Sequence, residues 1–163
     1  MINEITSVNA FPTSSKVWIY QANQPIDTND LEKANDMATA FANSWESHGR
    51  GLKATATILH DRFLFIMVDE SMTGASGCSI DSSVEFVRQL GTAINRDFFD
   101  RMIFSYKKDD AIHTVGREQF VALYQNGEIN DDTVVFDTLV NSKGDFDGGF
   151  EKRLGDSWHI KMV

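Results

Sequence analysis

The apolar and polar positions along the chain follow two different periods, which predict helices and strands in a definite order. Apolar residues recur at spacings of three and four over residues 31–45 and 84–98, as on a helix with one buried face. Residues 52–58 alternate apolar and polar side chains, which is typical of a half-buried strand. Residues 16–22 and 101–106 are rich in β-forming residues and predict two further strands.

The strand predicted over residues 62–68 is almost wholly apolar, so we expect it in the middle of a sheet. The resulting order, βαββαβ, is that of a ferredoxin-like fold, an antiparallel sheet with two helices on one face. The expected fold class is therefore α+β, with a ferredoxin-like core over residues 16–106. An N-terminal arm over residues 1–15 precedes this core, and a C-terminal α/β extension over residues 107–163 packs on it.

Within the extension the pattern predicts a hairpin, a short helix and one more strand. We expect the hairpin over residues 107–115, the helix over 117–126 and the strand over 133–140. Residues 141–149 contain three glycines and are expected to form a loop before a tail that carries Trp158.

A charge of −9 accompanies these elements, from 15 Lys and Arg against 24 Asp and Glu. This balance argues against nucleic acid as a partner, because binding to phosphates depends on cationic side chains. No apolar run approaches the ~20 residues of a membrane-spanning helix, so we expect no membrane insertion. With a single cysteine, Cys78, no disulfide can form within the chain, and we expect a cytoplasmic protein.

Five motifs resemble a family of small uncharacterised bacterial proteins that often carry the label "ABC transporter ATPase". They are Val17–Gln21, Met67–Glu70, Gly74–Asp81, Asp132–Phe136 and Asp156–His159. The resemblance covers nearly the whole chain, and it implies no established activity.

The ATPase label itself disagrees with the sequence. Phe63–Glu70 has the form of a nucleotide hydrolase strand that ends in magnesium-binding acids, but such enzymes also need Gly-x-x-x-x-Gly-Lys-Ser/Thr. The nearest stretch, Gly49–Ala54, lacks the Gly-Lys-Ser/Thr ending, and no Leu-Ser-Gly-Gly-Gln segment occurs. We therefore expect no ATPase activity.

The stretch from Asp69 to Asp81 gathers the residues best suited to chemistry between an apolar strand and a helix. We expect that helix to begin at Asp81, with Ser82 and Glu85 at capping-box spacing. A helix N-terminus can bind an anion and can lower the pKa of a thiol. The catalytic candidates are Cys78, Asp69 and Glu70, and the ligand-binding candidates are Gly74, Ser76, Gly77, Ser79 and Asp81.

Each of these residues also has a purely structural interpretation. A lone cysteine is most often a small buried side chain, and acids beside a helix start most often cap backbone amides. Asp69, Glu70 and Asp81 could together bind a hard cation, but their spacing is not diagnostic. The four histidines form no zinc-binding pair, so we expect no metal and no cofactor.

Aromatic residues suggest a different class of function, the binding of a partner. Residues from Phe120 to Phe136 resemble the GYF-like peptide-binding repeats through Gly-x-Ile-x-x-x-Thr-x-Val between Gly127 and Val135. Five aromatic residues could line a peptide groove, although core packing is the common role for such residues: Trp18, Tyr20, Tyr106, Tyr124 and Trp158.

The two interpretations give two hypotheses. The leading one is a non-enzymatic binding or scaffold protein whose partner is an unknown protein or small molecule. The alternative is a small enzyme or redox-responsive protein that uses the Asp69–Asp81 loop, with Cys78 at a helix N-terminus. The open face of a ferredoxin-like sheet would be covered either by the C-terminal extension or by a second subunit in a homodimer.

Overall fold

A three-stranded antiparallel sheet forms the centre of the protein, for which the computed structural model describes residues 10–163. Its order is β1 (Lys16–Gln21), β5 (Phe63–Asp69) and β4 (Lys53–Leu59). Every residue of β5 is buried, which confirms the expectation that this apolar strand lies in the middle. The expected arm falls partly on residues 1–9, which lie outside the described residues.

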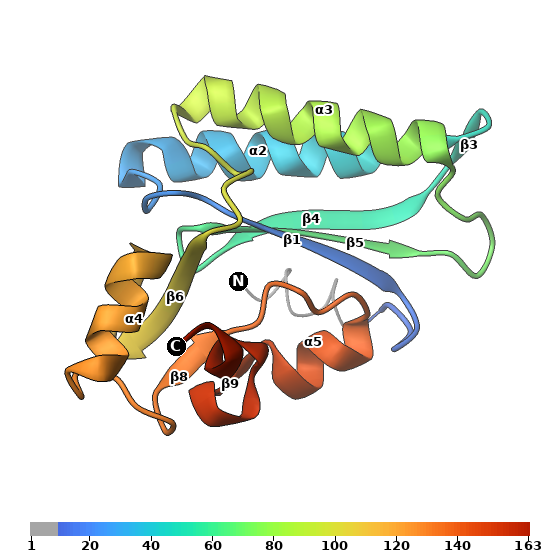
Figure 1. Cartoon of the computed structure of the whole chain (residues 1–163). Coiled ribbons are helices and arrows are strands. Elements are labelled where there is room, and N and C mark those ends of the chain that lie inside the picture. Colours follow the sequence, from blue (N-terminus) through green and yellow to red (C-terminus); the bar gives the residue numbers. More distant parts are fainter. Residues whose placement is uncertain (1–9) are drawn as a thin grey trace.

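Two long helices cover one face of this sheet, as Figure 1 shows. They are α2 (Thr28–Ser44) and α3 (Gly77–Ile94). Alternate residues of β5 contact the helices because successive side chains of a strand point to opposite faces. Leu64, Ile66 and Val68 accordingly belong to the core that includes Val87 and Leu90 of α3. A small hairpin of β2 (Glu46–Ser47) and β3 (Arg50–Gly51) follows α2.

The opposite face of the sheet is covered by α5 (Lys143–Gly149). Phe65 of β5 packs against Phe146 of this helix, with ring centroids 4.7 Å apart. Phe63 packs against Phe136 and Phe150 in the same layer. The expected loop over residues 141–149 therefore contains a helix, whose N-cap is Ser142 and whose apolar residues were too few to reveal a period.

A second antiparallel sheet lies beside the first one, with the order β7-β6-β8-β9. The strands are β6 (Ile103–Lys108), β7 (Ala111–Gly116), β8 (Val134–Phe136) and β9 (Glu151–Arg153). One helix, α4 (Arg117–Gln125), and two short 3-10 helices, η1 (Leu154–Asp156) and η2 (Trp158–Met162), belong to this part. Phe104, Phe120 and Leu154 are central to its core.

The α+β class is confirmed, but the single four-stranded sheet of the prediction is replaced by two sheets. Apart from the short hairpin of β2 and β3, which the sequence did not predict, the elements from β1 to β6 follow the order βαββαβ, and β5 lies between β1 and β4. The last strand, β6, pairs with β7 and β8 instead of β1. The hairpin with β7 satisfies one edge of β6, and Val135 of β8 pairs with Tyr106 on the other.

A polar joint connects the two sheets where β1 ends. The side-chain amide of Gln21 donates to the carbonyl oxygen of Ile103, 3.1 Å away, and accepts a hydrogen bond from the hydroxyl of Ser105. The hydroxyls of Ser105 and Thr114 are in turn 2.7 Å apart. The Thr114 hydroxyl also accepts a hydrogen bond from the guanidinium of Arg62. From Gln21 back toward Lys16, β1 runs away from β6 (Figure 1).

Candidate functional site

The two acids at the start of the Asp69–Asp81 loop are occupied by nearby partners. Asp69 accepts a hydrogen bond of 2.9 Å from the backbone amide of Ser71 and lies 3.5 Å from the Nζ of Lys53. The hydrogen bond from Ser71, helped by the charge of Lys53, holds the pKa of Asp69 below its usual value. Glu70 lies 3.2 Å from the Nζ of Lys16 and folds against Gly74, where a Cβ would stand 2.8 Å from its Oε2.

The serines of the loop cap α3, which begins at Gly77 and not at Asp81. Ser76 is the N-cap residue and forms a reciprocal capping box with Ser79. The carbonyl of Ser79 also accepts a hydrogen bond of 2.8 Å from the indole of Trp45. The capping box expected at Ser82 and Glu85 is therefore wrong: it lies six residues earlier, at Ser76 and Ser79, because Ser76 has the extended backbone that a cap needs.

The other candidates of the loop lie on the first turns of α3. Gly77 and Cys78 follow the cap directly, and Cys78 is exposed, in contrast to the buried position of most lone cysteines. Asp81 is exposed on the next turn. Within residues 10–163, no three His, Cys, Asp or Glu side chains are grouped as metal ligands would be. The chemistry predicted for Cys78 stays a prediction.

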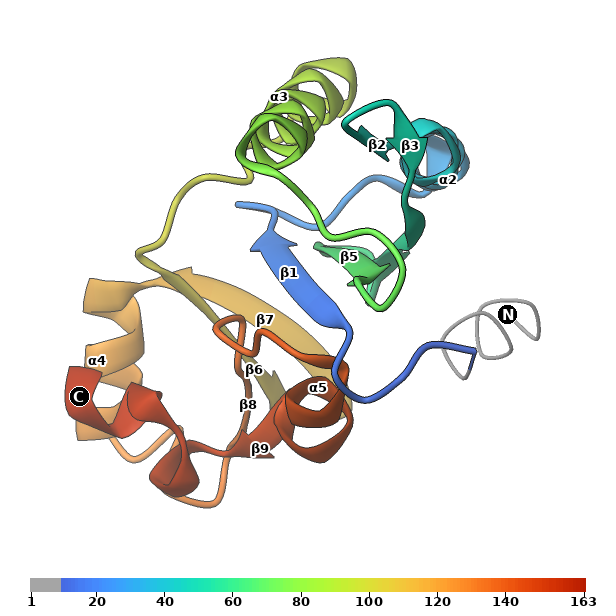
Figure 2. The same cartoon turned by 90° about the vertical axis from the view of Figure 1, so that its right-hand side faces the viewer.

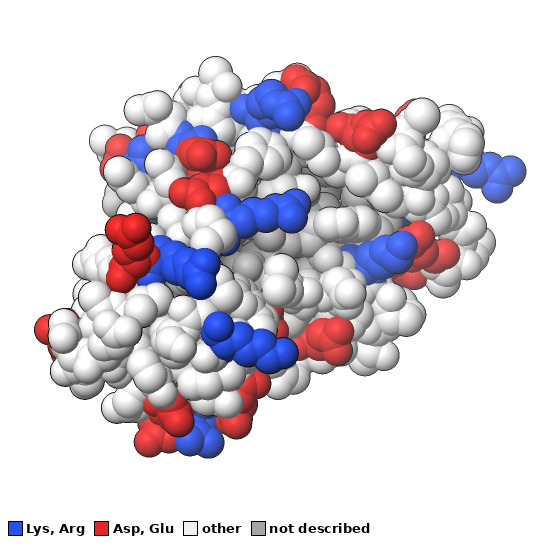
Figure 3. Space-filling view, viewed as in Figure 1, with Lys and Arg blue, Asp and Glu red and all other residues white. Residues whose placement is uncertain are grey.

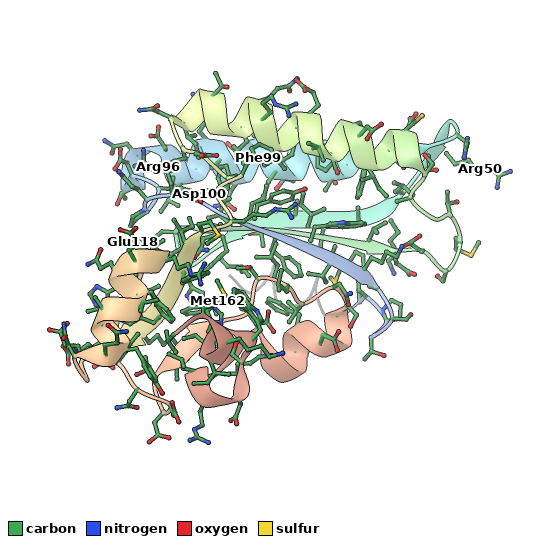
Figure 4. All side chains as sticks on the ribbon, viewed as in Figure 1. Arg50, Arg96, Phe99, Asp100, Glu118 and Met162 are labelled. Carbon is green, nitrogen blue, oxygen red and sulfur yellow. The ribbon has the colours of Figure 1, made fainter. Side chains whose placement is uncertain are left out.

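A groove of about 330 Å³ lies elsewhere, along the outer edge of β1. All residues from Val17 to Gln21 line it. The segment that follows α3, Phe98–Arg101, forms one wall, and Thr138–Asn141 forms the other. Trp158 of η2 and Ile103 of β6 complete the lining. Figure 4 labels Phe99 and Asp100 on the first wall, where the chain crosses from α3 to β6.

The edge of β1 inside this groove has backbone groups that no other part of the described chain uses. Antiparallel strands bond their neighbours through alternate residues. The amide of Ala22 donates to Arg62 on the β5 side, whereas the amides of Val17 and Asn23 donate outward, to Asn141 and Asp97. Ile19 shares the outward orientation of Val17 and Asn23. Among the hydrogen bonds of residues 10–163, none uses the amide or carbonyl of Ile19.

At the other edge of the sheet, alternate backbone groups of β4 also point outward, but there the outward amide has a hydrogen-bond partner. The amide of Ile58 in β4 points outward and donates at 3.0 Å to the side chain of Asn35 on α2. The hydroxyl of Thr57 contacts the same oxygen of Asn35 at 3.1 Å. A helix side chain thus supplies a partner for the edge of β4, as proteins commonly do for edge strands.

The first wall of the groove depends on a sharp reversal of the chain after α3. Asn95 ends the helix with a φ of 54°, and the next amide, Arg96, donates back to the carbonyl of Gly91. A Cβ on Gly91 would lie 2.6 Å from the backbone oxygen of Arg96 and 3.7 Å from the ring of Phe98. Gly91 therefore permits the close approach that brings Phe98 and Phe99 beside β1.

Exposed apolar side chains mark both walls. Four large hydrophobic residues among those described are strongly exposed, and two of them line the groove: Phe99 (42% exposed) and Leu139 (67%). A third, Met102, follows the lining residue Arg101 directly. Such a concentration at one recess is typical of a binding surface.

Three of the five aromatic residues predicted for a peptide groove line this one. Tyr20 meets Phe99 edge to face at 5.9 Å, and Trp18 meets Trp45 in the same manner. Trp158 is fixed by a hydrogen bond of 2.8 Å from its indole to Asp137. Tyr106 and Tyr124 belong instead to the core of the second sheet, which argues for the structural interpretation of these two.

A contact between Ser157 and His159 lies behind Trp158. The Ser157 hydroxyl and the Nδ1 of His159 are 2.6 Å apart, and both residues are buried. Burial lowers the pKa of His159 to about 4. Asp137 bonds to Trp158 and Lys152, so the three residue types do not form the relay of a catalytic triad.

The sequence did not predict the edge of β1 as a site. This edge is marked by a backbone amide and carbonyl without a hydrogen-bond partner among the described residues, and side-chain types do not reveal that. The only signal in the sequence was the position of Trp18 and Tyr20 on one face of the strand, and using it required knowing that β6 does not pair with β1.

No helix among residues 10–163 has the length and apolarity to cross a membrane. No protein-family model matches the chain, and no curated protein and no solved structure is significantly similar to it.

Proposed function

We propose that this protein binds an extended peptide segment of a partner protein, which adds as a strand to the outer edge of β1. The observation that carries this proposal is the amide and carbonyl of Ile19, which line a groove and have no hydrogen-bond partner in the described part of the chain. Strand addition supplies backbone hydrogen bonds for affinity, while pockets for alternate side chains give specificity. The exposed Phe99 and Leu139 would become covered by the bound segment.

The shape of the groove favours a single strand over a second copy of this chain. The edge lies between two walls, Phe98–Arg101 and Thr138–Asn141, which leave room for one extended segment. Pairing of two such edges in a dimer would bring the walls of both copies against each other, which disfavours that arrangement. The free edge between Val17 and Gln21 spans about 13 Å and accommodates about four residues.

The orientation of the bound segment follows from the chain's own contact at one end of the groove. Ser142 forms an antiparallel bridge with Lys16, and Asn141 accepts the hydrogen bond from Val17 before this segment leaves the edge. A partner strand that continues in this direction runs antiparallel to β1. Few backbone hydrogen bonds, each worth about 1 kcal/mol, predict a weak Kd of about 10 µM to 1 mM.

We further infer that the three-stranded sheet is a ferredoxin-like unit with a vacant fourth place. The order β1-β5-β4 and the two helices on one face support this inference. In a complete ferredoxin-like sheet the last strand lies antiparallel beside the first. The partner segment would take that place, while β6 builds the second sheet.

Amide exchange measured by NMR tests strand addition within a single strand. In the free protein the Ile19 amide should exchange much faster than the amides of Trp18 and Tyr20, which point toward β5. A blocked hexapeptide of alternating Thr and Val is a suitable probe. At saturating peptide we expect slow exchange at Ile19 and no change at Trp18 and Tyr20.

N-methylated versions of the same peptide provide the matched control. Methyl groups on one set of alternate amides remove the donors that face β1 and should abolish binding. Methyl groups on the other set point away from β1 and should leave Kd within about threefold. Equal binding by both sets, or an Ile19 amide that is already protected in the free protein, would overturn the proposal.

A further inference from the structure

The wall formed by Phe98–Arg101 carries a cation with no anionic partner. Arg101 is exposed and lines the groove, and among residues 10–163 no ion pair includes it. Its neighbour Asp100 accepts a hydrogen bond of 2.8 Å from the amide of Met102. Figure 3 shows basic side chains on several sides of the recess on this face, although the chain has an excess of nine acids.

A second unused donor lies beside Arg101. No hydrogen bond among the described residues includes the Tyr20 hydroxyl, and Tyr20 also lines the groove. Burial raises the pKa of Tyr20, while the charge of Arg101 opposes this effect, so the phenol keeps its proton at neutral pH. A guanidinium and a phenol together offer donors of the kind that bind a carboxylate.

We propose that the groove selects a segment with an aspartate or glutamate opposite Tyr20, whose side-chain carboxylate binds Arg101 and the Tyr20 hydroxyl. This inference rests on the proposed function. Residues directly opposite each other on neighbouring strands share a face of the sheet, so the acid meets Tyr20 on the helix side. In an antiparallel segment the residue opposite Trp18 comes two positions later and shares that face, where an apolar side chain fits.

The recognised pattern is therefore an acidic residue, any residue, and an apolar residue. The middle residue lies opposite Ile19 and forms the two backbone hydrogen bonds. The groove also closes near the Arg101 wall, where Asn23 bonds to Asp97 and Gln21 bonds to Ile103. The acidic side chain would thus be among the first residues of the bound segment.

Two blocked, fluorescein-labelled peptides test this selection by fluorescence polarisation. One is Thr-Val-Glu-Thr-Val-Thr, and the other has Gln in place of Glu. A charge-assisted pair predicts about tenfold tighter binding of the Glu peptide at low salt. Arg101→Gln should reduce this preference to less than about twofold, and Tyr20→Phe should reduce it by about threefold.

Arg50→Gln is the matched control, because it removes the same charge at the far end of the molecule (Figure 4). It should keep the tenfold preference. Equal binding of both peptides to the natural chain would overturn the carboxylate subsite and leave strand addition intact. An equal loss with Arg50→Gln and Arg101→Gln would likewise overturn it, since a general charge effect would then suffice. Failure of both peptides to bind would overturn this inference together with the proposed function.

Discussion

The Asp69–Asp81 loop and the groove along β1 show opposite ways of treating polar groups. In the loop, the polar side chains have partners: Asp69 accepts from the backbone amide of Ser71 and pairs with Lys53 of β4, and the Ser76 hydroxyl accepts from the amide of Ser79. In the groove, the backbone of Ile19 has no hydrogen-bond partner among residues 10–163, and it lies beside exposed apolar side chains. The comparison teaches that a cluster of reactive side chains need not form a functional site. A polar group without a hydrogen-bond partner is a better indication of where a ligand binds.

The two regions can be perturbed separately because they lie at opposite ends of α3. This helix has 18 residues, which corresponds to a length of about 27 Å. Cys78 lies on its first turn, and Phe99 follows its last turn. Changes in the loop should therefore alter stability without altering peptide binding, and changes on the walls should do the reverse.

Acidification gives the largest expected difference between the two regions. His159, behind the groove, has a pKa of about 4 against 6.5 for an ordinary histidine, because burial disfavours its charged form. The unfolded chain therefore binds more protons between pH 4 and 6.5, and the free energy of unfolding rises with pH through this window. We expect a loss of about 3 kcal/mol between pH 6.5 and pH 4, measured by urea unfolding.

His159→Asn separates this effect from other titrations. Its unfolding free energy should vary much less with pH between 4 and 6.5, whatever its absolute stability. An unchanged slope would show that another group is responsible. The lowered pKa of Asp69 predicts that the loop contributes its own loss only at more acidic pH, because a depressed carboxyl pKa gives stability that disappears as pH falls through it.

Removal of the helix cap is the next largest effect and acts on the loop side. Ser76→Ala deletes the oxygen that accepts the hydrogen bond from the Ser79 amide and should cost about 1 kcal/mol of unfolding free energy. Ser82→Ala provides the comparison, because Ser82 donates to Ser79 within the helix and does not cap it. If peptide binding weakened in Ser76→Ala, the two regions would not be independent.

The smallest change in stability is expected at Leu139, where the change in binding should be large. Leu139→Ser replaces an exposed side chain and should alter unfolding free energy by less than about 0.5 kcal/mol. The Thr-Val peptide should bind about fivefold more weakly, since less apolar surface is buried. Met72→Ser makes the same kind of change in the loop, where Met72 is 91% exposed. Equal effects of the two variants on Kd would contradict the assignment of the groove.

Sequence periodicity predicted the elements that bury a regular face and failed where pairing is decided at long range. The buried strand, predicted over residues 62–68 and observed as Phe63–Asp69, and the long elements up to β6 followed from the hydrophobic pattern, whereas the short hairpin of β2 and β3 was not predicted. The choice of β6 between β1 and β7 depends on the hairpin that follows it and on polar side chains such as Ser105 and Thr114. No local pattern expresses that competition.

The candidate residues show the same division. Of the five aromatic residues suggested for a peptide groove, Trp18, Tyr20 and Trp158 line one groove, while the binding of a peptide there stays a prediction. The loop residues were selected for their reactivity, and that choice could not reveal that Ser76 and Ser79 satisfy each other. Cap geometry of this kind depends on the backbone of one residue, which a sequence pattern does not fix.

Amino-acid substitutions at the polar joint around Gln21 would change the width of the groove. The side-chain amide of Gln21 donates to the carbonyl oxygen of Ile103 and accepts from the hydroxyl of Ser105, and these two hydrogen bonds link β1 to β6 at this end. Among residues 10–163 no strand pairing joins the two sheets, so these polar atoms, together with the packing of Phe63 on Phe136, hold the sheets at their angle. A chain with other residues at this polar joint would accept a bound segment with larger or smaller side chains, even with the same residues in both walls of the groove.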